Sequence, residues 1–277
     1  MSKETYKILF IGDIVARHGR RLIAKVLPGL REELALDYVI ANGENATTGH
    51  GLTIGAVEEM VAAGVDYFTT GNHVWRKEEF VQELNKKGTP VIRPANYLAG
   101  TPGRGYQLVE APFGKMLIIN LLGAEGISPY SGKHGTQYQI ESPFLTIDKI
   151  LQSTKKEKPV VIMVDIHAEW TSEKVAMGHY LDSRVTAVVG THTHIATADN
   201  RILPGGTAYV TDVGMTGPLN SVLGIKTEII IDRFKGGLPQ RFEVASGDGL
   251  LNAVLLTVNK SGKALSLARI DREIPVV

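Results

Sequence analysis

Along most of the chain, short apolar segments rich in valine and isoleucine alternate with longer amphipathic segments. The apolar segments are hydrophobic at consecutive positions, which is typical of strands that are buried on both faces of a sheet. The amphipathic segments carry apolar residues at helical spacing and predict helices packed on that sheet. Strands are predicted over residues 7–13, 37–45, 65–73, 90–94, 116–123, 160–169, 185–194 and 207–214, and helices over residues 20–34, 53–64, 77–88 and 171–184. Pro28 is expected to break or kink the first helix, because proline lacks the backbone N–H that a helix uses.

The pattern changes after residue 226. Four segments follow that resemble consecutive strands joined by glycine-rich turns, namely residues 226–234, 241–246, 251–260 and 264–271. They predict an antiparallel addition at the C-terminal end of the sheet. No repeat, low-complexity segment or long linker interrupts the chain. We therefore predict an α/β fold in one domain, residues 1–277, with mixed β-sheets, packed helices and C-terminal antiparallel strands.

Composition and charge exclude several classes of protein. The chain has 277 residues, of which 43% are hydrophobic and 21% are charged, and its net charge is +1. The balanced charge gives no electrostatic argument for binding a nucleic acid polymer or an acidic membrane. The absence of cysteine excludes disulfides, thiolate zinc sites and a cysteine nucleophile. No apolar stretch approaches the roughly 20 residues that span a bilayer, and no signal peptide is evident, so we predict a cytoplasmic protein that does not enter the membrane.

Polar residues cluster where the predicted strands end. In open α/β sheets, ligands bind beyond the carboxyl ends of the strands, so these side chains are expected to share one rim of the sheet. An Asp or Asn after a strand is usually a turn former, and a lone histidine is usually a packing residue, but five such strand ends are difficult to attribute to chance. The residues are Asp13, Glu44, Asn45, Asn72, His73, His167, His192 and His194.

His192 and His194 are two positions apart after an apolar run, and on an extended backbone they would project to the same side. Carboxylates, amide oxygens and several imidazoles without a thiolate suit Fe, Mn, Zn or Co, and are too rich in nitrogen for Mg or Ca alone. The candidate ligands outnumber those of one tetrahedral ion, and one carboxylate can bridge two ions. Pairs of metals about 3.5–4 Å apart recur in enzymes that cleave phosphate esters, so the residues favour a two-metal centre.

The series GD, GEN, GNH, H and GTHTH resembles the motifs of the calcineurin-like metallophosphoesterase superfamily. It resembles the YmdB-like branch more closely, through IANGEN, TTGNHVW, RPANY, TPGRGY, VDIHAE and TDVGMTG, and the likeness extends over essentially the whole chain. Two positions depart from the wider superfamily. Val15 stands where a histidine is usual, and the bridging acid is Glu44 rather than aspartate. The YmdB-like branch shares both changes.

The resemblance implies a metallophosphoesterase fold with two metal ions, Fe or Mn in the first place, with Zn also compatible. It implies a phosphodiesterase that hydrolyses small phosphodiesters such as 2′,3′-cyclic nucleotides by means of a hydroxide that bridges the metals. His73 would lie beside the second metal without binding it and would be the general acid. The implied ligands are Asp13, Glu44 and His194 for the first metal, with Asn45 near it, and Glu44, Asn72, His167 and His192 for the second, so that Glu44 is the bridge.

Other interpretations stay open at this point. The chain could be a metal-binding regulatory protein that acts through partner contacts, although such a protein would not need an acid at His73. A nuclease acting on short single-stranded RNA is a third alternative, and a homo-oligomer is compatible with the glycine-rich loops. Asp165 and Asp212 also follow apolar runs and are candidates for orienting the metal ligands. His50 flanks a predicted metal-site loop and could touch substrate, although exposure to solvent is the simpler expectation.

Overall fold

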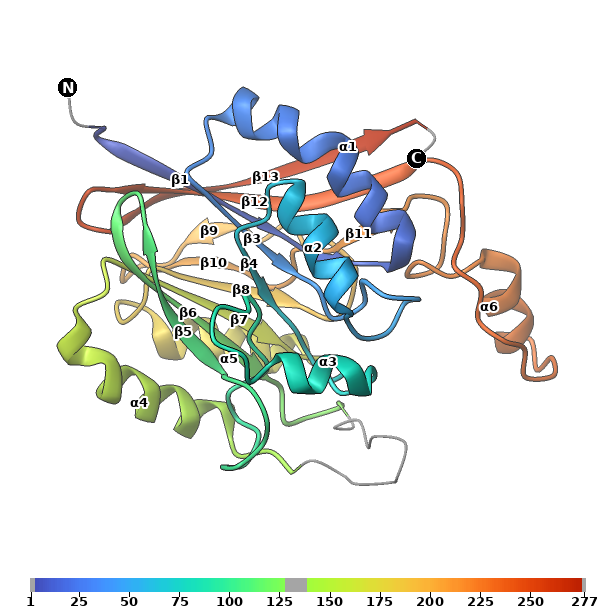
Figure 1. The fold of residues 1–277 in the computed structure, drawn as a ribbon, viewed down its shortest axis with the longest axis horizontal. Helices are drawn as coiled ribbons and strands as arrows, with labels where there is room; N and C mark the ends of the chain where they lie inside the picture. Colours follow the sequence, from blue (N-terminus) through green and yellow to red (C-terminus); the bar gives the residue numbers. More distant parts are fainter. Residues whose placement is uncertain (1–2, 128–138, 276–277) are drawn as a thin grey trace.

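Two β-sheets face each other at the centre of the computed structural model, which describes residues 3–127 and 139–275 (Figure 1). The first sheet has seven strands in the order β2–β11–β12–β1–β3–β4, with β13 paired to β12. Strands β1, β3 and β4 run parallel, whereas β12 runs antiparallel to both β1 and β13. The bounds are β1 Thr5–Ile11, β2 Asp13–Ile14, β3 Tyr38–Asn42, β4 Tyr67–Thr69, β11 Met215–Pro218, β12 Gly249–Asn259 and β13 Ala264–Ile274.

The second sheet has six strands in the order β5–β6–β7–β8–β10–β9. Its middle strands β6, β7, β8 and β10 are parallel, and each edge strand is antiparallel to its neighbour. The bounds are β5 Tyr106–Ala111, β6 Gly114–Leu122, β7 Val161–His167, β8 Ala187–Thr191, β9 Arg201–Ile202 and β10 Ala208–Val210.

Each sheet is buried on both faces because helices cover the two outer faces. On β1, Ile8 and Phe10 pack into the core between the sheets, while Leu9 and Ile11 pack against helices. This alternation follows from the two-residue repeat of a strand and explains why the predicted strands are apolar at every position. Helices α1 and α2 cover the first sheet, and α4 and α5 cover the second. The helices are α1 Ala16–Leu34, α2 Ile54–Ala62, α3 Glu78–Glu83, α4 Pro143–Thr154, α5 Thr171–Leu181 and α6 Thr227–Phe234, with a short 3₁₀ helix over Lys155–Glu157.

The α/β fold with mixed sheets and packed helices is confirmed, and four local predictions are wrong. Helix α1 is not broken by Pro28, since it continues from Ala16 to Leu34 with Leu22, Ile23 and Leu27 buried on its inner face. Residues 90–94 form no strand and contribute only a bridge between Val91 and Phe68. Residues 226–234 and 241–246, predicted as strands, form helix α6 and an irregular segment.

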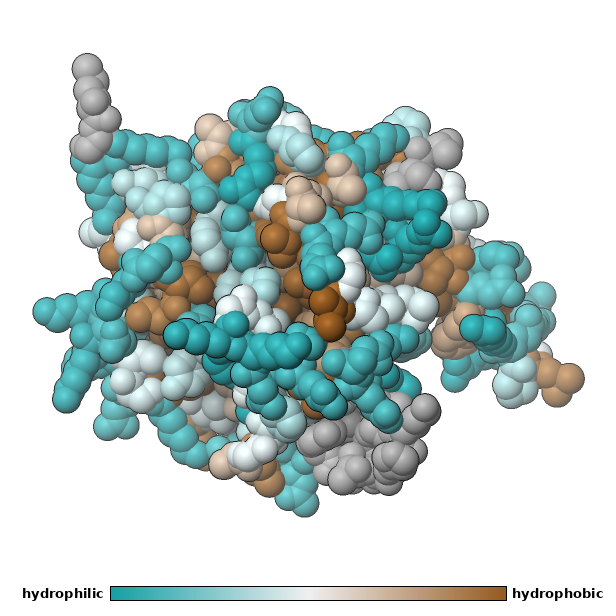
Figure 2. All heavy atoms as spheres, viewed as in Figure 1, coloured by the Kyte–Doolittle hydropathy of each residue, from teal (hydrophilic) through white to brown (hydrophobic). Residues whose placement is uncertain are grey.

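Helix α6 lies at one edge of the molecule, away from both sheets (Figure 1). Its apolar run is short and therefore ambiguous between strand and helix from sequence alone. Phe234 at its end is 84% exposed and Leu238 just beyond it is 85% exposed, and brown apolar atoms are visible at this outer end in Figure 2. The segment thus contributes little to either core.

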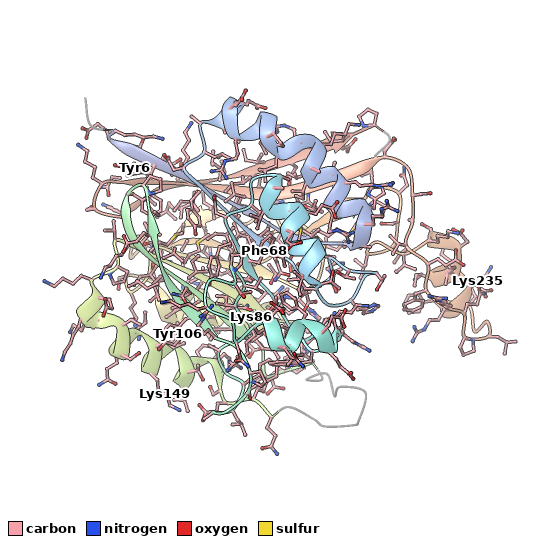
Figure 3. All side chains as sticks on the ribbon, viewed as in Figure 1. Tyr6, Phe68, Lys86, Tyr106, Lys149 and Lys235 are labelled. Carbon is pink, nitrogen blue, oxygen red and sulfur yellow. The ribbon has the colours of Figure 1, made fainter. Side chains whose placement is uncertain are left out.

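The last two strands do form an antiparallel pair, as predicted, but they are not an addition at the end of the sheet. Strand β12 is inserted beside β1, with Leu9 opposite Leu255, and is therefore central. Phe68 on β4 is fully buried in the middle of the molecule, while Lys149 and Lys235 project from its edges (Figure 3). Over residues 3–127 and 139–275, no helix is long and apolar enough to cross a membrane.

Candidate metal centre

The polar strand ends of the two sheets meet in one place. The first sheet supplies Asp13 in β2, Glu44 and Asn45 after β3, and Asn72 and His73 after β4. The second sheet supplies His167 at the end of β7 and His192 and His194 after β8. The prediction of a shared rim on one sheet is wrong in this respect, because the residues come from two sheets whose carboxyl ends lie together.

Glu44 is at the centre of this group and is 1% exposed. One carboxylate oxygen, Oε2, lies 3.1 Å from Nε2 of His167, and the other, Oε1, lies 3.2 Å from Nδ1 of His73. Burial alone would raise the pKa of Glu44, but the positive charges of His167 and His73 hold it well below its usual range. Glu44 is therefore a buried carboxylate with one oxygen beside the His167 imidazole and the other beside the side chains of His73 and Asn45.

His167 and His192 face each other beside Glu44. Nε2 of His167 lies 3.0 Å from Nδ1 of His192, and ligand atoms of Glu44, His167 and His192 all lie within 4.8 Å of one another. Burial lowers the pKa of His192 to about 3, with a further contribution from the charge of His167. Burial also opposes the charge on His167, but Glu44 and Asp13 outweigh it and raise the pKa of His167 to about 9. The carboxylates thus favour a positive charge on His167, whereas burial and the charge of His167 disfavour one on His192.

Asp13, Asn45 and His194 form a second group, although Oδ1 of Asp13 also lies 3.9 Å from Nδ1 of His167. Nε2 of His194 is 3.9 Å from Oδ1 of Asp13 and 3.1 Å from Nδ2 of Asn45. The same Asn45 nitrogen donates to Oε1 of Glu44 at 3.1 Å, and the Asn45 oxygen contacts Nδ1 of His73 at 2.9 Å. Asn45 therefore links this group of predicted ligands to His73. Its role as a metal ligand stays a prediction.

Two buried oxygen atoms indicate that metal ions fit this site. Within the described residues, Oδ1 of Asp13 and Oδ1 of Asn72 are both buried without a hydrogen-bond partner. Such atoms are costly unless something else satisfies them, and a cation does so. Gly71 permits the close approach of two other predicted ligands, since a Cβ there would lie 2.1 Å from Oε2 of Glu44 and 2.3 Å from Nε2 of His167. The donors, their burial and the small residue beside them all fit metal ions.

The loop that carries His192 and His194 is not an extension of β8. The strand ends at Thr191, and His192 and His194 have left-handed backbones with φ of 97° and 65°. The expectation that an extended backbone projects both imidazoles to one side is therefore wrong. The tight turn instead places His192 next to His167 and His194 next to Asp13 and Asn45.

Asp165 lies behind His167 and acts on it through Thr191. Nδ1 of His167 is 2.8 Å from Oγ1 of Thr191, whose hydroxyl donates to Oδ1 of Asp165 at 2.7 Å. Thr69 and Asn42 donate to the other oxygen of Asp165. Since the Thr191 hydroxyl donates its proton to the hydrogen bond with Asp165, the threonine oxygen accepts a hydrogen bond from Nδ1–H of His167. Nε2 is then left to bind a metal.

Sequence reasoning missed Glu169, which lies 2.9 Å from Nε2 of His192. A carboxylate on one imidazole nitrogen fixes the other nitrogen as a ligand, and this arrangement is common around metal-bound histidines. The only signal of Glu169 in the sequence is its position two residues after His167, within VDIHAE.

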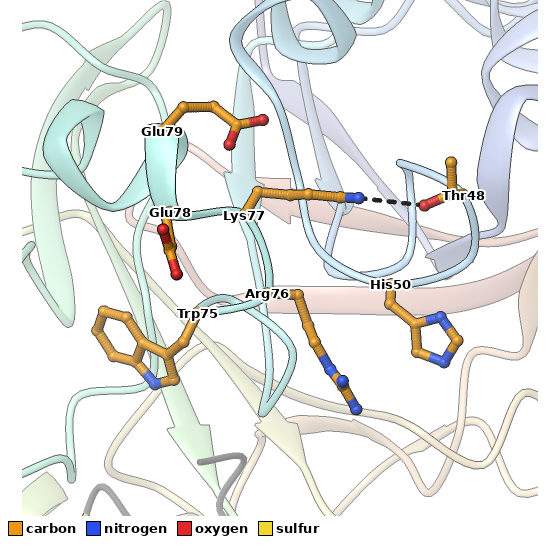
Figure 4. A pocket seen from close by; sticks show the side chains of 7 residues that line it. All are labelled: Thr48, His50, Trp75, Arg76, Lys77, Glu78 and Glu79. Carbon is orange, nitrogen blue, oxygen red and sulfur yellow. Dashed lines mark hydrogen bonds between the residues drawn. The ribbon is translucent and has the colours of Figure 1, made fainter. Parts of the chain in front are cut away.

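His50 is half-buried rather than exposed in a loop. Its ring lies 4.9 Å from that of His73, centroid to centroid, in an edge-on arrangement. It also lines a cavity of about 380 Å³ between the loop that carries Thr48 and the turn that carries Arg76 and Lys77 (Figure 4). Lys77 crosses this cavity to donate a hydrogen bond to Thr48. An opening of this size therefore lies next to the candidate acid.

Known proteins of similar sequence and structure share this arrangement of elements. The family model described as YmdB-like protein matches residues 9–270. The chain is 43% identical over 265 residues to a 2′,3′-cyclic-nucleotide 2′-phosphodiesterase of Bacillus subtilis (strain 168), with 95% of this chain and 96% of that protein covered. A solved structure from Mycoplasma pneumoniae, described as a novel phosphatase, superposes with a TM-score of 0.89 at 35% identity over 99% of this chain and 96% of that one. A hypothetical protein from Thermus thermophilus superposes with a TM-score of 0.87 at 39% identity over 97% of this chain and 100% of that one.

Proposed function

The chain belongs to the YmdB-like family, and on that premise we propose that it is a metal-dependent phosphodiesterase that hydrolyses small phosphodiesters such as 2′,3′-cyclic nucleotides. The observation that carries the proposal is the position of Glu44, whose two oxygens face His167 on one side and His73 on the other. The buried oxygens of Asp13 and Asn72, which lack hydrogen bonds within the described residues, support it.

We assign the ligands as the family resemblance implies, and the close contacts among the carboxylates and histidines support the assignment. Asp13, Glu44 and His194 would hold the first metal ion with Asn45 beside it, and Glu44, Asn72, His167 and His192 would hold the second. When bound, the two ions would supply positive charge for the phosphoryl oxygens and would make the attacking water more acidic. The donor set suits Fe, Mn or Zn. We expect Fe or Mn, in line with the family resemblance.

The chain's own residues provide the proton for the leaving group. Nδ1 of His73 is engaged by the Asn45 oxygen at 2.9 Å and by Glu44 at 3.2 Å, which orients the ring and leaves Nε2 to face the substrate. A proton on Nε2 can pass to the departing ribose oxygen, and histidine is the side chain that most often acts as a general acid. A protein that only bound metal as a regulatory scaffold would not need this oriented donor, and His73 therefore favours the enzyme.

The position of His73 also indicates where the substrate would bind. The nucleoside carries the leaving oxygen and must lie on the same side of the phosphorus as the acid. His50, which packs against His73, lines a cavity of about 380 Å³, a volume within the size range of small-molecule sites. We assign the nucleoside portion of the substrate to this cavity.

The test combines metal analysis with turnover. Protein purified without oxygen is analysed for Fe, Mn and Zn, and the same sample is assayed with 2′,3′-cyclic AMP and with bis-p-nitrophenyl phosphate. We expect two metal ions per chain and turnover of both substrates, with Glu44→Gln losing metal and activity together. Protein reconstituted with Fe or with Mn that turns over neither substrate would contradict the proposal.

A further inference from the structure

A buried ion pair lies behind the metal centre and does not belong to its ligands. Nζ of Lys174, on α5, lies 2.6 Å from Oδ2 of Asp212, which follows β10, and both side chains are fully buried. Removing two charges from water costs several kcal/mol per ion, so burial of such a pair is rarely explained by stability alone. The contacts of Asp212 indicate what the pair does.

One oxygen of Asp212 holds the residue between the two histidines. Oδ2 accepts hydrogen bonds from the backbone N–H of Thr193 at 3.1 Å and from its hydroxyl at 2.7 Å. Thr193 separates His192 and His194, whose left-handed backbones are unfavourable for residues other than glycine. The turn therefore keeps this shape only if its surroundings impose it, and Asp212 contacts its middle residue twice.

The other oxygen of Asp212 reaches the first sheet. Oδ1 of Asp212 accepts a hydrogen bond of 2.8 Å from the backbone N–H of Gly214. The carbonyl oxygen of Gly214 accepts a hydrogen bond of 3.0 Å from the backbone N–H of Asp13. Oδ2 of Asp13 in turn accepts a hydrogen bond of 3.1 Å from the backbone N–H of His192. Gly12 permits this approach, because a Cβ at Gly12 would lie 1.9 Å from the Gly214 carbonyl. The hydrogen bonds form a closed ring through both sheets.

We propose that the Lys174–Asp212 pair positions His192 and His194 relative to Asp13, and so sets the affinity of the centre for its metal ions. This inference rests on the proposed function, because it concerns the same centre. The Lys174 ammonium holds the Asp212 carboxylate in one orientation, with one oxygen toward Thr193 and the other toward Gly214. Lys174 and Asp212 are positioning residues and contact neither metal nor substrate.

The test changes the Thr193 hydroxyl, because Lys174→Met and Asp212→Asn leave one buried partner uncompensated and can prevent folding. Thr193→Val removes one hydrogen bond to Asp212 and keeps the side-chain shape, while Thr193→Ser restores the hydroxyl. Thr207→Val is the matched control, since the buried Thr207 hydroxyl donates to the carbonyls of Leu181 and Val185 and has no contact with the ring.

The dissociation constants for Mn²⁺ are measured by dialysing the Mn²⁺-loaded proteins against buffers of decreasing free Mn²⁺. Thr193→Val is expected to raise them by about 10–100-fold, as is usual when a group that orients metal ligands is lost. Thr193→Ser and Thr207→Val are expected to keep the wild-type constants, although Thr207→Val lowers the melting temperature. Wild-type Mn²⁺ affinity in Thr193→Val, or an equal loss in Thr207→Val, would overturn the inference. A wild-type protein that binds no Mn²⁺, Fe or Zn would overturn the proposed metal centre itself.

Discussion

His73 and Asn45 share a hydrogen bond of 2.9 Å between the imidazole Nδ1 and the side-chain oxygen. The same Asn45 side chain donates to Glu44 and lies 3.1 Å from Nε2 of His194. One amide thus orients the candidate acid and contacts two predicted metal ligands. Asn45, together with Glu44, therefore holds the candidate acid beside the predicted metal ligands.

His73→Ala is expected to leave the metal content unchanged and to lower kcat for 2′,3′-cyclic AMP by about 10²–10⁴-fold, the usual contribution of a positioned acid. The loss should be smaller with bis-p-nitrophenyl phosphate, because p-nitrophenolate needs little help from an acid to leave. Steady-state kinetics and elemental analysis on the same samples check this. His179→Ala, an exposed histidine on α5, is the control and should behave as wild type. Loss of metal in His73→Ala would show that His73 is a ligand rather than the acid.

His192 and His194 are expected to serve different metal ions. His192 faces His167 and His194 faces Asp13, so each single change to alanine should empty chiefly its own position. Elemental analysis should give close to one metal per chain in each variant, and anomalous scattering from crystals should locate the remaining ion on opposite sides of Glu44. If either change removes both ions to the same extent, the division of the ligands is wrong.

Thr191→Val is expected to weaken the centre on the His167 side. The change removes the oxygen that accepts from Nδ1 of His167 and leaves Asp165 without one of its donors. A buried group that loses its partner costs about 1–3 kcal/mol, so the free energy of unfolding should fall by that amount. Metal affinity should fall as well, because the ring of His167 is no longer oriented. Thr191→Ser keeps the hydroxyl and should recover the metal affinity, and a serine variant as weak as the valine variant would contradict the role of the hydroxyl.

The pH dependence of stability should reveal the environment of His50. Burial, together with the charges of His73 and Arg76, lowers the pKa of His50 to about 4, whereas an unfolded histidine has a pKa of about 6.5. Between these values the unfolded chain takes up a proton that the folded chain does not, so the contribution of His50 to the free energy of unfolding decreases as the pH falls from about 6.5 to about 4. Below that range both states are protonated and the loss is complete.

The measurement compares chemical denaturation of wild type and His50→Gln at matched pH and metal concentration. Glutamine has no such titration, so the difference between the two free energies should change across this window and stay constant above it. Parallel curves over the whole range would contradict the low pKa.

The residue types at the strand ends were sufficient to predict a candidate metal centre. Asp13, Glu44, Asn72 and His167 each follow a run of buried apolar residues, and their chemistry indicates metal ions without any knowledge of the fold. This works because the apolar repeat of a strand is local, as is the turn that exposes the residue after it. Helices α1, α2, α3 and α5 were predictable for the same reason, since an amphipathic face such as that of α1 repeats within a few residues, whereas α4 was not predicted.

Long-range contacts decided what the sequence left open. Whether Glu44 and His167 belong to one sheet or two depends on which strands pair, and strand pairing is set by burial over the whole chain. The apolar run at 227–234 was ambiguous because a short run fits a strand or a helix equally well, and only the absence of a sheet partner among the described residues makes it α6. Asp212 is distant in the sequence from every predicted ligand, and only the neighbouring positions of β8 and β10 bring its carboxylate to Thr193. The sequence by itself determined which donors are present, and the packing of the two sheets determined how they are arranged around Glu44.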